Sequence, residues 1–388
     1  MAEEMEPMTA YLDNSATTRV CQAACDAAMQ AMRTDYGNPS SLHGMGLAAE
    51  KQMTAARVGL AGLLGCGAGE LYFTSGATES NNLAVLGLAG AYPRAGRTIV
   101  TTAVEHPSVL EPAARLEQQG YTVKRLLPGA DGGIAPEAFA AAVDADTLLV
   151  SFMLVNNEVG TLFAAEQICR AVKQKSPNTF IHIDAVQGFC KVPFRLTAVK
   201  ADTVSISGHK IYAPKGVGGL FVRKGVRLKP LQVGGGQEKG LRSGTESVPL
   251  IAAFGAAAAE TARSMAANTA HYMELNAYLR ARLGALPGAV INSRPEAVPY
   301  ILNFSVPGIR SEIMLHHLER SGVYVSSGSA CAKGAGSHVL AALGLPREQS
   351  DSALRVSFSP DTTTAELDAL LTGLADGMAR LQRVRVRK

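Results

Sequence analysis

The alternation of strand-like and helix-like runs is the feature that most constrains how this 388-residue chain folds. Through roughly its first two-thirds, short apolar runs such as "ELYFTSG", "RTIVTTAVEH" and "NTFIHIDAVQG" are separated by helical stretches such as "PSVLEPAARLEQQG". This rhythm is typical of βαβ units, which build a mostly parallel sheet wrapped by helices. The run "GGLFVRK" predicts one antiparallel return strand within this α/β architecture.

A second domain is indicated where the character of the sequence changes. After the alanine-rich helical run "VPLIAAFGAAAAETARSMAAN", short strands such as "YILNFSVPG" and "ALRVSFSP" alternate with polar helices. A chain of this length exceeds one simple core. We predict a large domain over residues 14–258 and a smaller α+β domain built from residues 1–13 and 259–388.

Composition narrows the class of protein. Hydrophobic residues make up 47% of the chain and charged residues 18%, which is typical of a globular protein. No apolar run reaches the length of a membrane span, and the acidic start "MAEEMEPMTAYLD" lacks the apolar core of a signal peptide. We therefore expect a cytoplasmic protein with no membrane partner.

The charge distribution argues against a nucleic-acid-binding protein, and the cysteine spacing argues against a metal-binding protein. The net charge is +4, and basic residues gather only in the final run "RLQRVRVRK", where a solvated tail is favoured over a nucleic-acid-binding surface. We expect no direct nucleic-acid partner. Cys21 and Cys25 have helical spacing but no histidine at ligand distance, so we expect no metal site.

Polar clusters follow several of the predicted strands. They read "SGATES", "VEHPS", "NNE", "DAVQ" and "SGHK". Ligands of parallel α/β sheets bind beyond the carboxyl ends of the strands. One such cluster is ordinary loop chemistry, but several at the same edge predict a single site.

The residues in these clusters suggest a cofactor. Lys210 ends a β-branched run, and a buried lysine is either an ion-pair partner or a nucleophile. Asp184 ends an apolar strand and needs a cation or strong donors, which an arginine or a pyridinium N–H supplies. His106 is either structural or stacks on a flat ring, and "TSGATES" is either a plain helix cap or a phosphate cradle. Together these features describe a pyridoxal phosphate site.

The whole chain resembles a cysteine desulfurase of the NifS/IscS-like group, among the class-V aminotransferase-like enzymes of fold type I. The resemblance rests on "YLDNSATT", "GNPSSLH", "FTSGATESNN", "EHPSVL", "NNEVG", "HIDAVQ", "SGHKIYAPKGVGG", "GGGQEKGLRSGT", "SSGSACA" and "ALRVSFS". It implies a mostly parallel seven-stranded sheet in the large domain, pyridoxal phosphate as cofactor, and a smaller α+β domain that carries the catalytic cysteine loop.

The resemblance also implies catalytic roles for residues of this sequence. Lys210 would hold the cofactor covalently, His106 would stack on its ring and help move protons, and Cys331 would be the nucleophile. Arg355, helped by Asn157, would bind the carboxylate of the substrate.

A larger set would hold the cofactor. Asp184 would pair with the ring nitrogen and Gln187 with the ring hydroxyl, and Thr245 would reach the phosphate of a neighbouring subunit, which implies a homodimer. The expected cofactor-binding residues are Ala77, Thr78, His106, Asn157, Asp184, Gln187, Ser207, His209, Lys210 and Thr245.

The activity implied is conversion of L-cysteine to L-alanine. The sulfur would pass as a persulfide on Cys331 to an acceptor protein, for iron–sulfur clusters, other thio-cofactors or tRNA thiolation. A selenocysteine lyase or another class-V aminotransferase is the first alternative. A non-catalytic sulfur-carrier or assembly subunit is the second, which a complete set of site residues disfavours. The short C-terminal tail leaves docking to an iron–sulfur scaffold open.

Overall fold

A computed structural model describes residues 9–129, 132–327 and 336–381 of the chain. Its centre is a seven-stranded sheet in the order β2-β8-β7-β6-β5-β3-β4. The strands are β2 (Leu71–Thr74), β3 (Thr98–Thr102), β4 (Thr122–Leu126), β5 (Thr147–Met153), β6 (Phe180–Asp184), β7 (Thr203–Ser207) and β8 (Gly218–Val222). β8 runs antiparallel to both neighbours, and the other pairs are parallel. The mostly parallel sheet and its antiparallel return strand are thus confirmed.

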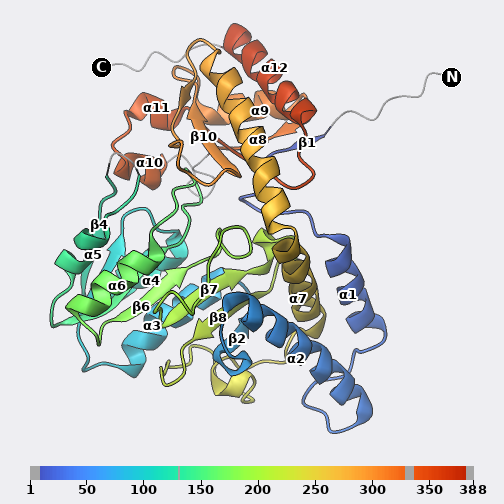
Figure 1. Ribbon diagram of the computed structural model, residues 1–388, viewed down its shortest axis with the longest axis vertical. Helices are drawn as coiled ribbons and strands as arrows, with labels where there is room; N and C mark the ends of the chain where they lie inside the picture. The colour runs from blue at the N-terminus through green and yellow to red at the C-terminus, as the bar shows by residue number, and fades with distance from the viewer. Residues whose placement is uncertain (1–8, 130–131, 328–335, 382–388) are drawn as a thin grey trace.

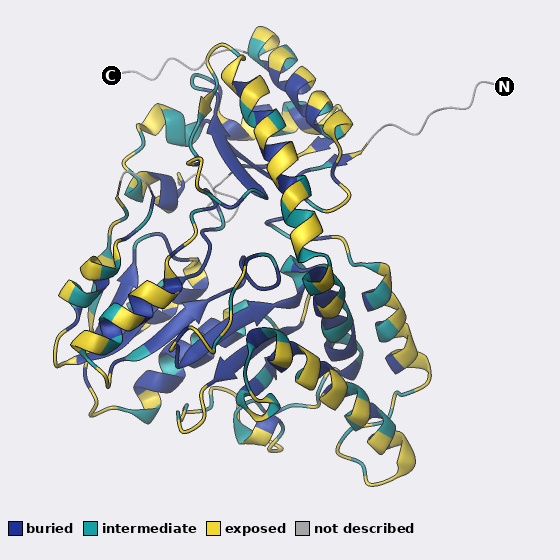
Figure 2. Cartoon of the chain, viewed as in Figure 1, coloured by how far each residue is buried: buried dark blue, intermediate teal, exposed yellow. Residues whose placement is uncertain are grey.

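Helices cover this sheet and bury its strands. Every residue of β3, β5, β7 and β8 is buried, whereas the edge strand β4 is partly exposed. Figure 2 shows the dark blue strands lying between helices whose outer faces are exposed. The helices of this part are α1 (Gln22–Arg33), α2 (Gly44–Leu64), α3 (Ala77–Ala91), α4 (Pro107–Gln118), α5 (Pro136–Ala142), α6 (Ala165–Lys175) and α7 (Val248–Arg263), and α1 packs on the outer side of α7.

The C-terminal part of the chain forms two further sheets. An antiparallel sheet has the order β12 (Ser326–Ser327), β13 (Ala353–Ser357), β10 (Ile301–Ser305) and β9 (Val290–Ile291). The N-terminal strand β1 (Ala10–Tyr11) pairs in parallel with β11 (Val323–Tyr324), so the start of the chain joins this part. The accompanying helices are α8 (Met265–Gly284), α9 (Ser311–Glu319), α10 (His338–Ala342), α11 (Arg347–Asp351) and α12 (Thr364–Arg380).

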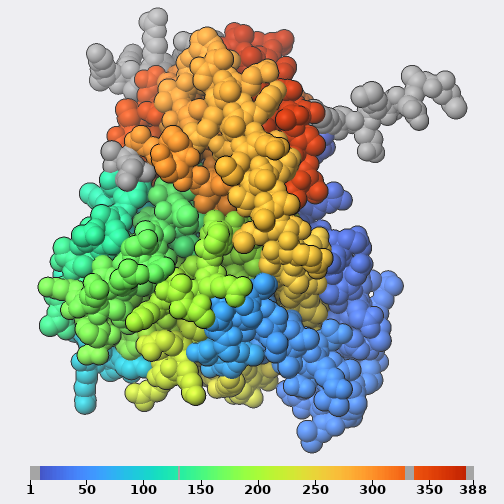
Figure 3. All heavy atoms as spheres, viewed as in Figure 1, coloured from blue at the N-terminus to red at the C-terminus, as the bar shows by residue number. Residues whose placement is uncertain are grey.

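The alanine-rich run proves to be two helices, α7 and α8, which meet at Ser264. They form a column that runs from the large sheet into the C-terminal part (Figure 1). Figure 3 shows the orange and red C-terminal elements seated directly on the green and teal middle part of the chain. The predicted domain boundary at residues 258/259 falls inside α7 and stays a prediction. In the described part of the chain, no helix is long and apolar enough to cross a membrane.

Candidate active site

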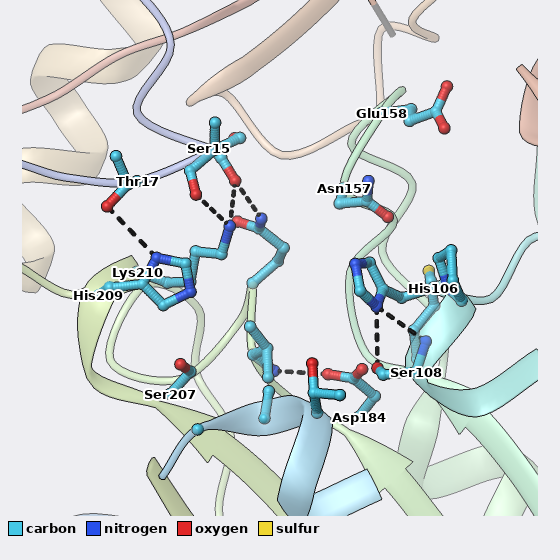
Figure 4. Close-up of a pocket in the computed structure, with 18 of the residues that line it drawn as sticks. Ser15, Thr17, His106, Ser108, Asn157, Glu158, Asp184, Ser207, His209 and Lys210 are labelled. Atoms are coloured by element: carbon cyan, nitrogen blue, oxygen red, sulfur yellow. Dashed lines mark hydrogen bonds between the residues drawn. The ribbon is translucent and has the colours of Figure 1, made fainter. Parts of the chain in front are cut away.

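A pocket of about 790 Å³ lies where the carboxyl ends of the large-sheet strands meet the C-terminal part. Its walls come from both parts of the chain: Asp184 ends β6, Ser207 ends β7, and Arg355 lies on β13. In Figure 4, Lys210 and His106 face each other across the pocket, and Asp184 lies at its floor. The polar clusters after separate strands therefore do converge, as the parallel topology requires.

Lys210 sits in the 3₁₀ turn η2 (Gly208–Lys210) that follows β7 directly. Its Nζ donates to the backbone carbonyls of Ser15 and Ala16, at 2.6 Å each. These carbonyls come from the loop after β1, so the amine is held by dipoles close to the pocket. An amine in this setting is positioned to react with a carbonyl group in the pocket.

Asp184 is buried, and its carboxylate accepts two hydrogen bonds. Asn81 Nδ2 donates to Oδ2 at 2.8 Å, and the backbone N–H of Val186 donates to Oδ1 at 3.0 Å. Asn81 is itself oriented by His182, whose Nε2 lies 3.0 Å from its Oδ1. Both donors to Asp184 are neutral, so a cationic N–H placed in the pocket would complement this buried charge.

His106 caps the N-terminus of α4. Its Nδ1 accepts from the backbone N–H of Ser108 at 3.1 Å, which places the proton of the neutral ring on Nε2. Burial lowers the pKa of His106, and the nearby Asp184 carboxylate opposes that shift. The ring is therefore a neutral N–H group that lines the pocket at neutral pH.

The other end of the pocket is suited to an anion. Ala77 and Thr78 open α3, and their end of the helix lines the pocket with N–H groups that have no partner within the helix. Among the described residues, Ser207 Oγ is buried without a hydrogen-bond partner. His209 contacts Thr17 Oγ1 at 3.3 Å, and burial lowers its pKa to about 4. An orphaned hydroxyl beside a helix N-terminus fits a phosphate group.

Arg355 is almost fully buried on β13, where the C-terminal part lines the pocket. Its Nη1 donates to the backbone carbonyl of Asn157 and its Nη2 pairs with Asp13, both at 2.8 Å. Among the described residues, its buried Nε has no partner. Asn157 thus contributes a backbone group to the orientation of this guanidinium, while its side chain is drawn in Figure 4 near the pocket.

Some residues that line the pocket or contact its lining were not predicted from the sequence. Asp13 and Ser15 act through an ion pair and a backbone carbonyl, and both lie in the quoted run "YLDNSATT". Glu158 belongs to the polar cluster "NNE"; it is buried, accepts from Ser337 Oγ, and burial raises its pKa to about 7. The sequence motifs that contain these residues could be recognised, but their contacts with Arg355, Lys210 and Ser337 could not be predicted from them.

Two other predicted site residues differ in where the structure places them relative to the pocket. Gln187 lines the pocket and donates through Nε2 to the Ser15 carbonyl at 2.9 Å. Thr245 is exposed and does not line the pocket of its own chain, so its predicted role toward a neighbouring subunit stays a prediction. Cys331 lies outside the described residues.

Comparison with known proteins identifies the family of this chain. The family model described as "Aminotransferase class-V" matches residues 10–370. A cysteine desulfurase of Nostoc sp. is 39% identical, covering 96% of this chain and 93% of the relative. Cysteine desulfurase IscS 1 of Archaeoglobus fulgidus is 35% identical, covering 96% and 97%.

A solved structure supports the same relationship. A NifS-like protein superposes with a TM-score of 0.92 at 39% identity, covering 96% of this chain and all of that one. The chain therefore belongs to the class-V aminotransferase family and, within it, to the cysteine desulfurases of the NifS/IscS type.

Proposed function

We propose that this chain is a pyridoxal-phosphate-dependent cysteine desulfurase, in which Lys210, Asp184 and Arg355 serve one reaction at L-cysteine. The observation that carries the proposal is that these three side chains line a single pocket although they come from β6, the turn after β7 and β13. An amine, a buried carboxylate and a buried guanidinium together bind a cofactor and an amino acid.

The described residues fit the cofactor. Ser207, His209 and the N-terminus of α3 would hold its phosphate, Asp184 would keep a proton on its ring nitrogen, and Lys210 would attach it. When bound, the cofactor withdraws electrons from the carbon that carries the substrate's amino group. The orphaned Ser207 hydroxyl and the neutral donors around Asp184 are the features of this structure that favour the fit.

The protein's own groups would then bind the substrate and move its protons. The Arg355 guanidinium would bind the substrate carboxylate, for which its planar fork is suited. Lys210 Nζ would take the proton from the α-carbon and return it later in the reaction. His106, with its proton on Nε2, would shield and orient the reacting atoms from the opposite side.

Sulfur transfer requires a thiolate, and we assign that role to Cys331. Its sulfur would attack the sulfur of L-cysteine, so that an S–S bond forms as the substrate C–S bond breaks. The electron pair of the broken bond stays with carbon, which takes a proton and becomes the methyl group of alanine. The step is redox-neutral: one thiol and one cysteine give one persulfide and one alanine.

We also propose two protein partners, a second copy of this chain and a sulfur acceptor. Exposed apolar side chains run from α1 through the following loop into α2, and such a run supports a homodimer interface. They are Met29, Met32, Tyr36, Leu42, Met45 and Leu47. In a homodimer, Thr245 would reach the neighbouring pocket. We further propose that the persulfide passes to an acceptor protein in the cytoplasm.

The test of this function is the stoichiometry of the products. Purified protein with pyridoxal phosphate, L-cysteine and a thiol reductant should release alanine and sulfide in equal molar amounts. Cys331→Ala should lose both products, because no acceptor for the sulfur remains. Cys25→Ala, which removes an exposed cysteine of α1, is the matched control and should keep wild-type rates. Alanine or sulfide production that survives in Cys331→Ala would contradict the assignment of the nucleophile.

A further inference from the structure

Lys191 lies directly behind the pocket and is not among the residues that line it. It follows Gln187 by four residues in the turns that come after β6. Its Nζ donates to Gln187 Oε1 at 3.2 Å and lies 4.7 Å from the centre of the Tyr300 ring. The ammonium is therefore held between an amide oxygen and an aromatic face.

This contact fixes the orientation of the Gln187 amide. A lysine ammonium only donates hydrogen bonds, so Gln187 Oε1 faces Lys191 and its NH₂ group faces away from it. Nε2 donates to the Ser15 carbonyl at 2.9 Å. The backbone carbonyl of Gln187 accepts from the Tyr300 hydroxyl at 2.7 Å, which fixes the main chain at the same residue.

The network continues to the reactive amine. The Ser15 carbonyl that accepts from Gln187 also accepts from Lys210 Nζ, at 2.6 Å. Lys191 is thus connected to Lys210 through one side-chain amide and one carbonyl oxygen. A substitution at Lys191 would therefore affect the pocket by changing the orientation of the Gln187 amide.

Burying the charged ammonium of Lys191 has a desolvation cost, which suggests that this lysine has a role in the site. Burial, with the charge of the nearby Lys210 ammonium as the second cause, lowers the pKa of Lys191 to about 7. The charged and titratable groups that face it are Lys210, Cys190, Arg355 and, through its ring, Tyr300. A methionine of similar length would pack there without a desolvation cost, so stability alone does not call for a lysine.

We propose that Lys191 is a positioning residue that holds the Gln187 amide in one orientation, with its NH₂ group directed toward the ring oxygen of the cofactor. The inference rests on the proposed function, because it takes Gln187 as the residue beside that oxygen. Without Lys191 only the Ser15 carbonyl still holds the NH₂ group, so the amide rotates more readily and presents its carbonyl oxygen more often. That oxygen repels both the cofactor's ring oxygen and the Ser15 carbonyl.

The test is a spectroscopic pH titration of the cofactor-loaded protein without substrate. In Lys191→Met, the cofactor's ring oxygen loses a hydrogen-bond donor, so the proton next to it is held more tightly. The pH midpoint of the change in the visible absorption band should rise by about one unit, the size expected for one charge-assisted hydrogen bond. Lys200→Met, a change at an exposed lysine, should leave the midpoint unchanged.

A double-mutant cycle separates positioning from the charge of Lys191. Gln187→Leu should raise the midpoint by a similar amount, and adding Lys191→Met to it should produce no further change. Additive shifts would show that Lys191 acts through its charge and would overturn the proposal. Lys191→Arg keeps a donor at this position and should retain the wild-type midpoint, so a shift as large as that of Lys191→Met also overturns it.

The two failures can be told apart. If the loaded wild-type protein has no visible band that changes with pH, the proposed function fails and this inference falls with it. If the wild-type band titrates and Lys191→Met does not move its midpoint, only the role of Lys191 is refuted.

Discussion

At the scale of single residues, Arg355 shares its guanidinium between the protein and the space left for a substrate. Asp13 occupies Nη2 and the Asn157 carbonyl occupies Nη1, while Nε is buried without a partner among the described residues. Asp13 therefore orients the guanidinium, but it also places a negative charge near the carboxylate that Arg355 is proposed to bind. These two effects on affinity have opposite signs.

Replacing Asp13 by Asn separates these effects. The amide oxygen of Asn still accepts from Arg355, whereas the negative charge is gone. We expect the KM for L-cysteine to fall by about fivefold, which corresponds to roughly 1 kcal/mol of relieved repulsion in a partly solvated site. Steady-state kinetics on the variant measure this, with Asp26→Asn on the exposed face of α1 as control. A rise in KM would mean that the charge of Asp13 matters mainly for holding Arg355 in place.

At the scale of elements, the start of α3 is fixed by contact between two backbones. A Cβ added at Gly218, the first residue of β8, would lie 2.7 Å from Gly76 Cα and 2.9 Å from the carbonyl oxygen of Ile206. Both neighbours are main-chain atoms that no rotamer change can move. Gly76 has φ +153°, which favours glycine, and precedes the helix N-terminus that lines the pocket.

Gly218→Ala should therefore damage the phosphate end of the pocket. We expect the free energy of unfolding to fall by about 1–3 kcal/mol, the usual cost of overpacking, and pyridoxal phosphate to bind about tenfold more weakly. Denaturant unfolding and cofactor titration measure the two effects. Gly62→Ala in α2 meets open space and should instead stabilise the protein by about 1 kcal/mol. Unchanged cofactor affinity in Gly218→Ala would show that α3 does not depend on this contact.

At the scale of the whole molecule, buried titratable groups make stability depend on pH. His182 is fully buried between β6, β7 and α3, where it contacts Thr203 Oγ1 and Asn81 Oδ1. Burial lowers its pKa to about 3, below the ordinary value of 6.5. The unfolded chain thus binds a proton below pH 6.5 that the folded chain excludes, and stability is lost as the pH falls from 6.5 toward 3.

Groups with raised pKa values act in the opposite direction. Burial raises the pKa of Glu105 to about 8 and that of Glu158 to about 7, so the folded chain keeps protons there that the unfolded chain has released. The contribution of these two glutamates to the free energy of unfolding is fully present below pH 4.5. It is lost as the pH rises through their pKa values of about 7 and 8 in the folded chain. The contribution of His182 is therefore best measured as a difference between two proteins.

We expect wild type to lose stability relative to His182→Gln by about 1.4 kcal/mol per pH unit below pH 6.5. Urea unfolding of the cofactor-free proteins at pH 6.5 and pH 5 measures the difference, about 2 kcal/mol over this interval. A constant difference between wild type and His182→Gln would mean that His182 binds its proton as readily in the folded chain as in the unfolded chain.

The sequence by itself determined the fold class and the chemistry of the site. The alternation of apolar and amphipathic runs is local, so it predicted the strands of the large sheet, several helices between them and the return strand β8 without knowledge of their contacts. Lys210, Asp184 and His106 stand at strand ends, where parallel topology alone brings them to one edge. Because these patterns depend only on residues that are close in sequence, they can be recognised without the tertiary structure.

Only the tertiary structure decided which groups support that chemistry. Arg355 meets Asp13 across 342 positions of sequence, and Lys210 meets the Ser15 carbonyl across 195. The sheet order and the pairing of β1 with β11 bring these groups together, and no local pattern encodes either. Backbone carbonyls, the contact between Gly76 and Gly218, and the Lys191–Gln187–Tyr300 arrangement exist only in the folded chain. Their energies depend on burial and on distances that the sequence does not state.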